Sequence, residues 1–315
     1  MSEAEAFTPE KIAVVGAGPV GCIVAAFLEK GGIDVVLCDV MPELLKSARD
    51  QGIRVTGAET VHQRISRTCT GVDELAGYRP DVIVIAVKAT VLPLIASAIK
   101  GFLGKGMYVV SWQNGIDTEL ELARTLGRES VLRAVVNYGC SLKGPGEVVM
   151  GFHHPPHYIQ ELDSGAQEAA VKIADLFTRC GLETRRTEEI VSMVWRKSAM
   201  NASMNPVCAV TGMTMAQAMN DPIVFQTVEV LLKECLAVAR ANEISLGWDF
   251  YPYAMTYLRN AGNHKPSMLM DVENSRRTEI DFINGKVAAY GAQAGMTTPY
   301  NTTLTSLVKG LESKK

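Results

Sequence analysis

The stretch Lys11-Ile12-Ala13-Val14-Val15-Gly16-Ala17-Gly18-Pro19-Val20-Gly21 decides the fold of this chain. An apolar run typical of a buried strand leads into a GxGxxG turn, and a small, apolar helical segment follows from Cys22 to Leu28. Gly16 makes the tight turn, Gly18 lets the backbone approach a pyrophosphate, and Gly21 lets the helix lie close to the strand. The N–H groups at the start of such a helix bind phosphate, aided by the helix macrodipole. We therefore predict a dinucleotide site at Gly16, Ala17, Gly18, Pro19, Val20 and Gly21.

The composition is that of a globular protein with two domains. The 315 residues are enough for two ordinary domains, and 47% apolar residues allow each domain a core. The 31 basic and 34 acidic side chains leave a net charge of −3, which gives no electrostatic footprint for nucleic acid or an anionic membrane. Seven cysteines without a C-x-x-C pair predict reduced thiols and a cytoplasmic protein. We expect neither a secretion signal at the N-terminus nor a membrane span.

Strand and helix patterns continue to alternate beyond the first unit. Strand-like runs occur at residues 34–39, 82–87, 107–112 and 131–137, with helical patterns between them. We therefore expect an α/β fold in which residues 1–186 form a Rossmann domain with a doubly wound parallel sheet. Ligands bind at the carboxyl ends of such strands, where Lys88 and Asn114 fall. The Gly-, Pro- and His-rich segment 144–157 is interpreted as an irregular edge hairpin.

The remaining residues, 187–315, predict a mostly helical second domain. Three segments carry helical spacing, at 188–205, 222–242 and 277–292. Asp221 and Pro222 supply a cap and a first-turn proline for the middle helix. Pro206 is expected to disrupt the first helix just after Asn205. No metal site is predicted, because His153, His154 and His157 lie in a proline-broken loop without a nearby carboxylate or cysteine.

Polar residues interrupt the apolar faces of two of these helices. A projection at 100° per residue places Lys197, Asn201 and Asn205 within the apolar stripe of the first helix. A lysine there either extends its stem to water or places its ammonium in a polar site. Glu279 flanks the apolar stripe of the third helix. Each residue has an ordinary interpretation, as a domain-edge lysine, helix-terminating asparagines and an exposed first-turn glutamate. Together, in the helical domain of a nucleotide-binding protein, they predict a polar cleft facing the nicotinamide.

Five motifs occur in an order that is specific for one family. They are the GxGxxG turn, Val87-Lys88, Gln113-Asn114-Gly115, the run WRKSAMNASMNP at residues 195–206, and Pro266-Ser267-Met268-Leu269 followed by RTEIDFING at 277–285. In these motifs, over nearly all of its length, the chain resembles the ketopantoate reductase (2-dehydropantoate 2-reductase) family. The resemblance implies an N-terminal Rossmann domain and a C-terminal all-helical domain of the 6-phosphogluconate dehydrogenase type.

The resemblance also implies roles for individual residues. Lys197 aligns with the catalytic lysine, Glu279 with the active-site glutamate beside the cofactor, and Lys88 with a lysine of the cofactor cleft. The positions that align with substrate-binding residues are Asn114, which also reaches the nicotinamide ribose, Asn201, Asn205 and Ser267. The implied reaction is hydride transfer from NAD(P)H to the ketone of 2-dehydropantoate, giving (R)-pantoate for pantothenate and coenzyme A biosynthesis. Negative charge then grows on the ketone oxygen, where the ammonium of Lys197 can supply the proton.

The chain departs from the family pattern just past the second strand. Family members that use NADPH carry an arginine that pairs with the 2′-phosphate, whereas this chain has Val40 there, preceded by Asp39. An aspartate at that point accepts hydrogen bonds from the ribose hydroxyls and repels a phosphate. We therefore expect NAD(H), with NADP(H) as the alternative if Lys46 or Arg49 reaches the phosphate.

Two other functions remain open from the sequence. An NAD-dependent 2-hydroxyacid dehydrogenase acting on another branched or aromatic 2-oxo acid would keep the fold and the lysine. A catalytically silent nucleotide-binding protein would keep only the fold. The expected partner is a small-molecule 2-oxo acid, and the assembly that the sequence leaves open is a homodimer.

Overall fold

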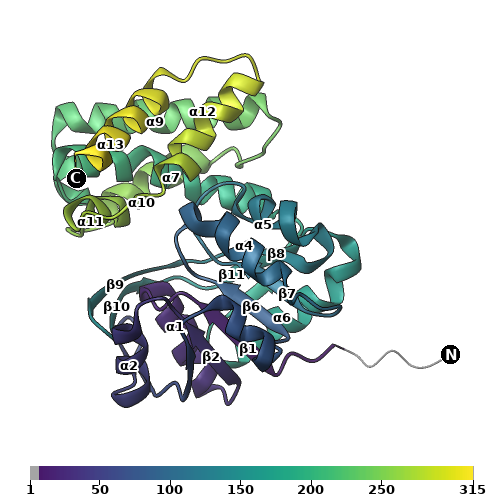
Figure 1. Ribbon diagram of the computed structural model, residues 1–315. Helices are drawn as coiled ribbons and strands as arrows, with labels where there is room; N and C mark the ends of the chain where they lie inside the picture. The colour runs from purple at the N-terminus through teal and green to yellow at the C-terminus, as the bar shows by residue number, and fades with distance from the viewer. Residues whose placement is uncertain (1–6, 315) are drawn as a thin grey trace. The chain divides into compact units, whose positions relative to one another are not determined.

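The computed structural model describes residues 7–314, and Figure 1 shows their helices and strands. The described chain divides into two units. The first unit extends to Gln113 and resumes from Thr118 to Ile190, and the second combines Asn114–Asp117 with the residues from Val191 onward. The segment 114–117 thus belongs to the second unit, although its sequence neighbours on both sides belong to the first.

The first unit contains the predicted parallel, doubly wound sheet. Within the described residues its eight strands lie in the order β12-β11-β8-β7-β6-β1-β2-β5. The strands that run parallel to one another are β1 (Lys11–Val15), β2 (Asp34–Cys38), β5 (Arg67–Cys69), β6 (Val82–Ile85), β7 (Tyr108–Ser111) and β8 (Val131–Val135). At the edge, β11 (His157–Glu161) pairs antiparallel with β8, and β12 (Thr184–Arg186) pairs parallel with β11. The strand order reverses between β1 and β6, so the glycine turn after β1 lies at the switch point where such sheets bind ligands.

Helices connect these strands as the alternating pattern predicts. They are α1 (Pro19–Lys30), α2 (Pro42–Asp50), α3 (Leu75–Tyr78), α4 (Leu92–Lys100), α5 (Thr118–Leu126) and α6 (Gln167–Arg179). Most predicted strands are found one or two residues shorter than their apolar runs, because the last residues of each run lead into a loop at the carboxyl edge.

A second sheet in the same unit was not expected from the sequence. Among the described residues it has four strands in the order β4-β3-β10-β9, namely β3 (Ile53–Gly57), β4 (Val61–Gln63), β9 (Tyr138–Gly144) and β10 (Glu147–His153). Helix α1 contacts strands of both sheets, and its residues from Gly21 to Leu28 are buried. This explains why the side chains of α1 are mostly small and apolar on all sides of the helix. The hairpin expected at 144–157 is displaced: β9 and β10 form it over residues 138–153, with two irregularities in their register.

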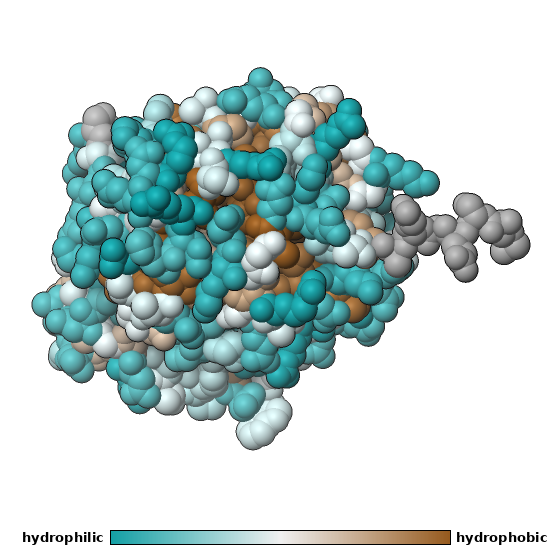
Figure 2. Space-filling view, turned by 90° about the horizontal axis from the view of Figure 1, so that it is seen from below, coloured by the Kyte–Doolittle hydropathy of each residue, from teal (hydrophilic) through white to brown (hydrophobic). Residues whose placement is uncertain are grey.

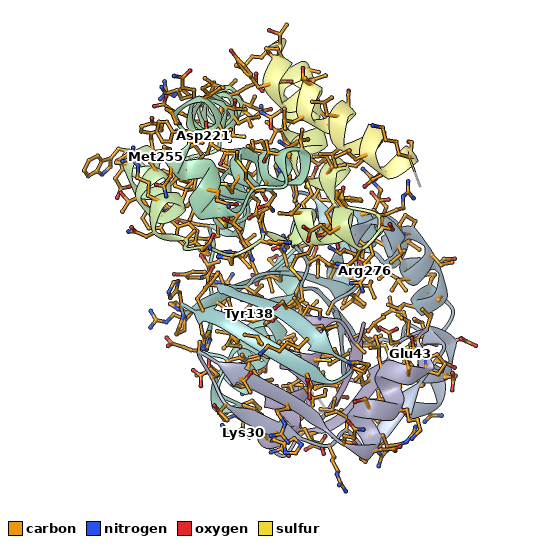
Figure 3. All side chains as sticks on the ribbon, turned by 90° about the vertical axis from the view of Figure 1, so that its left-hand side faces the viewer. Lys30, Glu43, Tyr138, Asp221, Met255 and Arg276 are labelled. Carbon is orange, nitrogen blue, oxygen red and sulfur yellow. The ribbon has the colours of Figure 1, made fainter. Side chains whose placement is uncertain are left out.

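The second unit is helical, as predicted. Its helices are α7 (Ile190–Thr211), α8 (Met215–Asn220), α9 (Pro222–Ala241), α10 (Phe250–Asn260), α11 (Ser267–Glu273), α12 (Asn284–Gln293) and α13 (Pro299–Ser313). Asp221, labelled in Figure 3, caps α9, because its carboxylate accepts the N–H groups of Ile223 and Val224, both at 2.9 Å. Helix α9 contacts α8, α10, α12 and α13, and so forms the centre of this unit.

Helix α7 continues through Pro206, which corrects the expectation that the helix is disrupted after Asn205. A proline inside a helix leaves the carbonyl four residues earlier without its usual donor. That carbonyl belongs to Ala202, and it accepts instead from the side-chain amide of Asn284 at 2.9 Å. A donor from a distant part of the chain thus replaces the missing backbone N–H.

The helix expected over 277–292 is also interrupted. A short 3-10 turn, Ile280–Phe282, follows Glu279, and Ile283 adopts φ −110° and ψ −89° before α12 begins at Asn284. Glu279 therefore lies at the start of a tight turn rather than on the flank of a helix. The helical period at 277–283 reflects burial of Ile280 and Ile283 and not a continuous helix.

The surface follows the usual distribution of polar and apolar residues. Figure 2 shows polar side chains over most of the face seen from below, with apolar side chains visible between them. No helix among residues 7–314 combines the length and the apolar character needed to cross a bilayer.

Candidate functional site

The glycine turn in the first unit has the geometry that its sequence predicts. Gly16 adopts φ +111°, and a Cβ added there would lie 2.9 Å from the carbonyl carbon of Ala86. A Cβ added at Gly21 would lie 1.8 Å from the carbonyl oxygen of Gly16. Gly16 and Gly21 are therefore required by the close approach of the turn to its own backbone and to the neighbouring strand. At Gly18 an added Cβ would meet nothing within 4 Å, so the open space that a pyrophosphate needs is present there.

Asp39 contacts this turn directly. Its Oδ2 accepts the N–H of Ala17 at 2.6 Å, and its Oδ1 accepts the N–H of Met41 at 2.9 Å. Its own N–H donates to the carbonyl of Cys69 at 3.1 Å, which fixes the carboxyl end of β2 against β5. Because a carboxylate oxygen can accept more than one hydrogen bond, the carboxylate of Asp39 retains acceptor capacity beside the turn.

The cations considered as alternatives for binding a phosphate are held on α2. Lys46 forms an ion pair with Asp50, and Arg49 donates to Oγ1 of Thr68 at 3.1 Å. Val40 is 83% exposed and carries no charge. Arg49, Thr68 and other residues of α2 and β5 line an open surface hollow near the end of β5.

Cys22 supports the turn from inside α1. Its thiol donates to the carbonyl of Ala17 at 3.2 Å. Burial, and secondarily the negative charge of Asp39, raises the pKa of Cys22 to about 12. The thiol is therefore protonated at neutral pH and acts as a buried donor rather than a nucleophile.

Two further predicted residues follow neighbouring strands. Lys88 precedes a 3-10 turn, Ala89–Val91, after β6, and its side chain is partly buried. Asn114 follows β7 and is partly buried, and its Oδ1 is buried with no hydrogen-bond partner among the described residues. A buried amide oxygen without a donor is costly, so this atom suits a ligand that brings an O–H or N–H group. The open space at Gly18 and the unpaired amide oxygen of Asn114 are thus features that suit a bound ligand.

Helix α7 presents three predicted residues on one face of the second unit. Lys197, Asn201 and Asn205 follow one another at four-residue intervals. Lys197 and Asn201 are partly buried, and Asn205 is 6% exposed. Burial does not separate the two faces of this helix, because Ser203 on the opposite side is fully buried as well, so the placement of these polar residues on an apolar stripe stays a prediction.

The remaining predicted residues of the second unit differ in burial. Glu279 is buried, which excludes the ordinary interpretation of an exposed first-turn glutamate. Ser267, the first residue of α11, is exposed. Asp271 lies one turn later on the same helix and is buried, a carboxylate that sequence reasoning missed. Its spacing of four residues from Ser267 is the signal that could have drawn attention to it.

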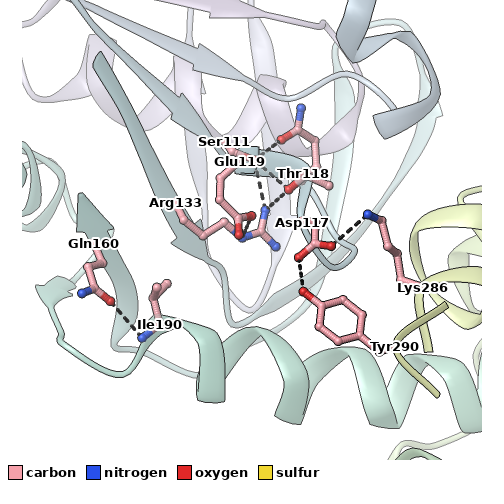
Figure 4. Close-up of polar contacts among 10 residues, drawn as sticks. Ser111, Asp117, Thr118, Glu119, Arg133, Gln160, Ile190, Lys286 and Tyr290 are labelled. Carbon is pink, nitrogen blue, oxygen red and sulfur yellow. Dashed lines mark hydrogen bonds and ion pairs between the residues drawn. The ribbon is translucent and has the colours of Figure 1, made fainter. Parts of the chain in front are cut away.

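Sequence reasoning also missed Asp117. This residue adopts φ +62°, and its carboxylate accepts from Nζ of Lys286 at 2.8 Å and from the hydroxyl of Tyr290 at 2.9 Å (Figure 4). The backbone of the same segment is held as well, because the N–H of Ile116 donates to the carbonyl of Phe282 at 2.8 Å. The segment that carries Asn114 is thus tied to the turn that follows Glu279.

Buried polar contacts fix the residues that flank this segment in the first unit. The guanidinium of Arg133, which is 2% exposed, donates to the hydroxyls of Ser111 and Thr118 and lies 3.4 Å from Glu119 (Figure 4). The hydroxyl of Ser111 donates to Oε1 of Gln113 at 2.7 Å. A buried guanidinium needs both a counter-charge and hydrogen-bond acceptors, and this network supplies both.

Two histidines of the 144–157 segment lie in an aromatic cluster. The rings of His153 and His157 lie 5.3 Å apart, and both rings lie near Tyr138, whose hydroxyl accepts from Trp112 at 3.0 Å. The expectation that no carboxylate lies nearby is wrong for His153, which contacts Glu59 at 3.1 Å. Across the described ranges, no group of three or more histidine, cysteine, aspartate or glutamate residues is placed to hold a metal ion.

Comparisons with curated proteins agree over almost the entire chain. The 2-dehydropantoate 2-reductase of Streptococcus pyogenes serotype M3 is 31% identical over 304 residues, covering 95% of this chain and 97% of that protein. The 2-dehydropantoate 2-reductase of Pyrococcus abyssi is 27% identical over 311 residues, covering 97% of this chain and 100% of that protein.

Solved structures show the same architecture. D-mandelate dehydrogenase with NADH and anilino(oxo)acetate superposes with a TM-score of 0.87 at 27% identity, covering 96% of this chain and 98% of that one. A PanE/ApbA family ketopantoate reductase from Ralstonia eutropha JMP134 gives a TM-score of 0.85 at 26% identity, covering 96% and 99%. These likenesses support an NAD(P)-dependent oxidoreductase.

The profiles of one family match both parts of the chain. Ketopantoate reductase PanE/ApbA matches residues 12–163, and the C-terminal domain of the same family matches residues 189–312. The resemblance found in the sequence motifs is therefore confirmed, and the chain belongs to the ketopantoate reductase PanE/ApbA family.

Proposed function

We propose that this protein reduces the ketone of 2-dehydropantoate to the hydroxyl of (R)-pantoate with a nicotinamide cofactor. Dinucleotide binding is assigned to residues 1–186 and substrate chemistry to residues 187–315. The observation that carries the proposal is the face of α7, on which Lys197, Asn201 and Asn205 follow one another at one-turn intervals in a family of reductases. The names of the relatives, at about 30% identity, supply the substrate.

In the proposed mechanism Lys197 is the general acid. The bound nicotinamide would supply the hydride to the ketone carbon. The ammonium of Lys197 gives its proton to the ketone oxygen and stabilises the negative charge that grows there, and water then reprotonates the amine. Asn201 orients the ammonium or a substrate hydroxyl, and Glu279 accepts a hydrogen bond from a substrate hydroxyl. Ser267 donates to the substrate carboxylate, and Asn205 and Asn114 complete the polar contacts.

The experiment that tests this mechanism is steady-state kinetics of Lys197→Ala with ketopantoate. We expect kcat to fall by about 10²–10⁴-fold, because a proton donor acts mainly in the transition state. The dissociation constant of NADH, measured by fluorescence, should change little. Val191→Ala serves as a matched control, because Val191 is an exposed residue of the same helix. Wild-type turnover in Lys197→Ala would remove the lysine from its role.

For the cofactor we propose a preference for NADH. Gly18 leaves the open space, Lys88 lies at the carboxyl end of the next strand, and the carboxylate of Asp39 contacts the turn. Asp39→Ala with Val40→Arg should raise the NADPH-to-NADH ratio of kcat/KM by about tenfold or more, since the change removes a repulsive carboxylate and adds a phosphate partner. Val40→Leu is the control. An unchanged ratio in the double variant would contradict the assignment.

A second candidate function is supported by one structural likeness. The D-mandelate dehydrogenase structure, which contains NADH and anilino(oxo)acetate, has a TM-score of 0.87 with this chain. An NAD-dependent 2-hydroxyacid dehydrogenase would keep the same lysine chemistry. A panel of ketopantoate, 2-oxoisovalerate and phenylglyoxylate, each with both cofactors, separates the candidates by kcat/KM. NADH binding without turnover on any of these acids would indicate the catalytically silent alternative.

The proposed setting is the cytoplasm. The seven cysteines of the chain are all free thiols in the structure, although Cys38 and Cys69 lie opposite each other on paired strands. A reducing compartment keeps such thiols unpaired.

A further inference from the structure

Three hydrogen bonds hold the segment Asn114–Asp117 to the rest of the second unit. The carboxylate of Asp117 accepts from Lys286 at 2.8 Å and from Tyr290 at 2.9 Å, and the N–H of Ile116 donates to Phe282 at 2.8 Å. Figure 4 shows both carboxylate contacts. These contacts join residues that are 169 and 173 positions apart in the sequence. They lie outside the residues to which the proposed mechanism assigns a role.

We propose that Asp117 is a positioning residue that holds the amide of Asn114 in a fixed relation to Glu279, and thereby sets the affinity for the 2-oxo acid. The inference rests on the proposed function, because Asn114 and Glu279 contact substrate only in that function. Asp117 itself touches neither substrate nor cofactor. It acts through the backbone of its own segment.

The backbone of the segment shows why an anchor is needed. Gly115 adopts φ +109° and Asp117 adopts φ +62°, so a short segment has two residues in the left-handed region. Such a conformation costs free energy for a residue with a side chain and persists only when the surroundings impose it. The two side-chain contacts of Asp117 and the N–H contact of Ile116 supply that restraint. Without them the segment would relax and carry Asn114 with it.

Backbone hydrogen bonds connect the segment Asn114–Asp117 with the turn that follows Glu279. Phe282, which accepts from Ile116, donates its own N–H to the carbonyl of Glu279 at 3.0 Å. Asn114 and Glu279 are therefore connected through two backbone hydrogen bonds and one residue of the 3-10 turn.

The same anchor also reaches α7. The ring of Tyr290 packs edge-on against the ring of Trp195, with centroids 5.1 Å apart. Trp195 is 1% exposed and lies two residues before Lys197. One carboxylate thus connects the three pieces of chain that carry Asn114, Glu279 and Lys197.

The ion pair of Asp117 with Lys286 is more deeply buried than an exposed ion pair elsewhere in the same unit. The side chains of Asp117 and Lys286 are 14% and 22% exposed, whereas the ion pair of Lys309 with Asp281 in the same unit is 51% and 46% exposed. Breaking a largely buried pair leaves a charge without its partner, while breaking an exposed pair changes little. Lys309→Met is therefore a matched control for Lys286→Met.

The test compares Asp117→Asn, Lys286→Met, Lys286→Arg and Tyr290→Phe with wild type. Asparagine tolerates the left-handed region, so Asp117→Asn changes the charge and not the backbone preference. Each variant is measured for KM and kcat with ketopantoate, for the NADH dissociation constant, and for thermal stability. If Asp117→Asn fails to fold, Lys286→Met and Tyr290→Phe each remove one of the two contacts and carry the test.

We expect KM for the 2-oxo acid to rise about tenfold in Asp117→Asn and Lys286→Met, because a displaced orienting group weakens substrate binding. The NADH dissociation constant should stay within about twofold, and Lys286→Arg should restore most of the KM. A merely structural role would lower the active fraction, and with it the apparent kcat, at an unchanged KM. A wild-type KM in Asp117→Asn, or an equal rise of KM in Lys309→Met, would overturn the inference.

The activity of the wild type and the KM values of the variants test two different statements. If the wild-type protein reduces none of the acids in the panel, the proposed function fails and the role of Asp117 fails with it. If the wild type is active and the Asp117 and Lys286 variants keep its KM, only the positioning role fails.

Discussion

The amide of Asn284 compensates for the proline inside α7, and this compensation can be measured. Pro206 has no N–H, so the carbonyl of Ala202 loses its helical donor, and Nδ2 of Asn284 donates to it at 2.9 Å. Ala202 and Asn284 are both fully buried. We predict that Asn284→Leu and Pro206→Ala are energetically coupled, because the second change restores the donor that the first removes.

The size of the coupling follows from the cost of an unsatisfied buried carbonyl, about 1–3 kcal/mol. In Asn284→Leu the carbonyl of Ala202 has neither donor, so the variant loses about 2 kcal/mol of stability by this route. In Pro206→Ala alone the carbonyl already has a partner, and the gain is small. When both changes are present, the backbone N–H at position 206 pairs with the carbonyl. The double variant should therefore be more stable than the sum of the single effects by about 1–2 kcal/mol.

Other consequences of the substitutions cancel in this cycle. Asn284 also donates to Oδ1 of Asn301 at 2.9 Å, and that bond is lost in both backgrounds. The greater freedom of the unfolded chain without Pro206 is likewise the same in both backgrounds. The coupling energy thus isolates the contact between Asn284 and the helix carbonyl.

The assay is urea-induced unfolding followed by tryptophan fluorescence, with the linear dependence of the unfolding free energy on urea. Trp195, fully buried on α7, reports on the helix in question. Asn242→Leu combined with Pro206→Ala is the control cycle, because Asn242 also donates to a helix carbonyl, that of Val238, but on α9. A coupling below about 0.3 kcal/mol in the Asn284 cycle, or an equal coupling in the control cycle, would refute the reasoning.

The glycine turn and the buried thiol of Cys235 can be tested in the same way. Gly21→Ala should lower both stability and NADH affinity, because its Cβ would lie 1.8 Å from the carbonyl oxygen of Gly16, whereas Gly18→Ala should keep wild-type stability and lose only NADH affinity. Thermal melts and NADH titrations check both, and normal NADH binding in Gly18→Ala would contradict the pyrophosphate assignment. Burial raises the pKa of Cys235 from 9.0 to about 12, so its contribution to stability is complete below pH 9 and is lost as the pH rises toward 12. Urea unfolding at pH 8 and pH 10.5 should show a smaller loss of stability in Cys235→Ala than in wild type; an equal loss would show that this thiol does not contribute.

The strand–turn–helix core of the first unit could be predicted from the sequence because its signals are local. Each glycine of the turn and each apolar strand reports on neighbours within a few residues, and β1, α1 and β2 were placed by that pattern. The four-stranded sheet escaped prediction for the opposite reason. Its strand β3 pairs with β10 in a register that joins Arg54 to Glu147, and β4 has only three residues. A strand of three residues shows no period, and a pairing between β3 and β10 joins residues too far apart in the sequence for a local pattern to reveal it.

The residues of the candidate site also differ in whether their signals are local in the sequence. Lys197, Asn201 and Asn205 were found because a four-residue interval on a helix is visible in the sequence. The segment after Glu279 forms a turn although its sequence has the pattern of a helix, because buried isoleucines at 280 and 283 imitate a helical stripe. Asp117 gave no signal, since its partners lie more than 160 residues away.

The proline of α7 shows what the long-range contacts achieve. From local rules Pro206 ends the helix, yet the helix continues, because Asn284 supplies the donor. Asn284 in turn contacts Asn301, whose backbone N–H and side-chain amide both donate to the buried carboxylate of Glu234, at 2.8 and 2.6 Å. These hydrogen bonds form a network that connects α9, α13, the start of α12 and α7. Side chains without a part in the reaction therefore hold the helix that carries the proposed acid, at the turn that its proline weakens. Substitutions in this network should alter turnover as well as stability.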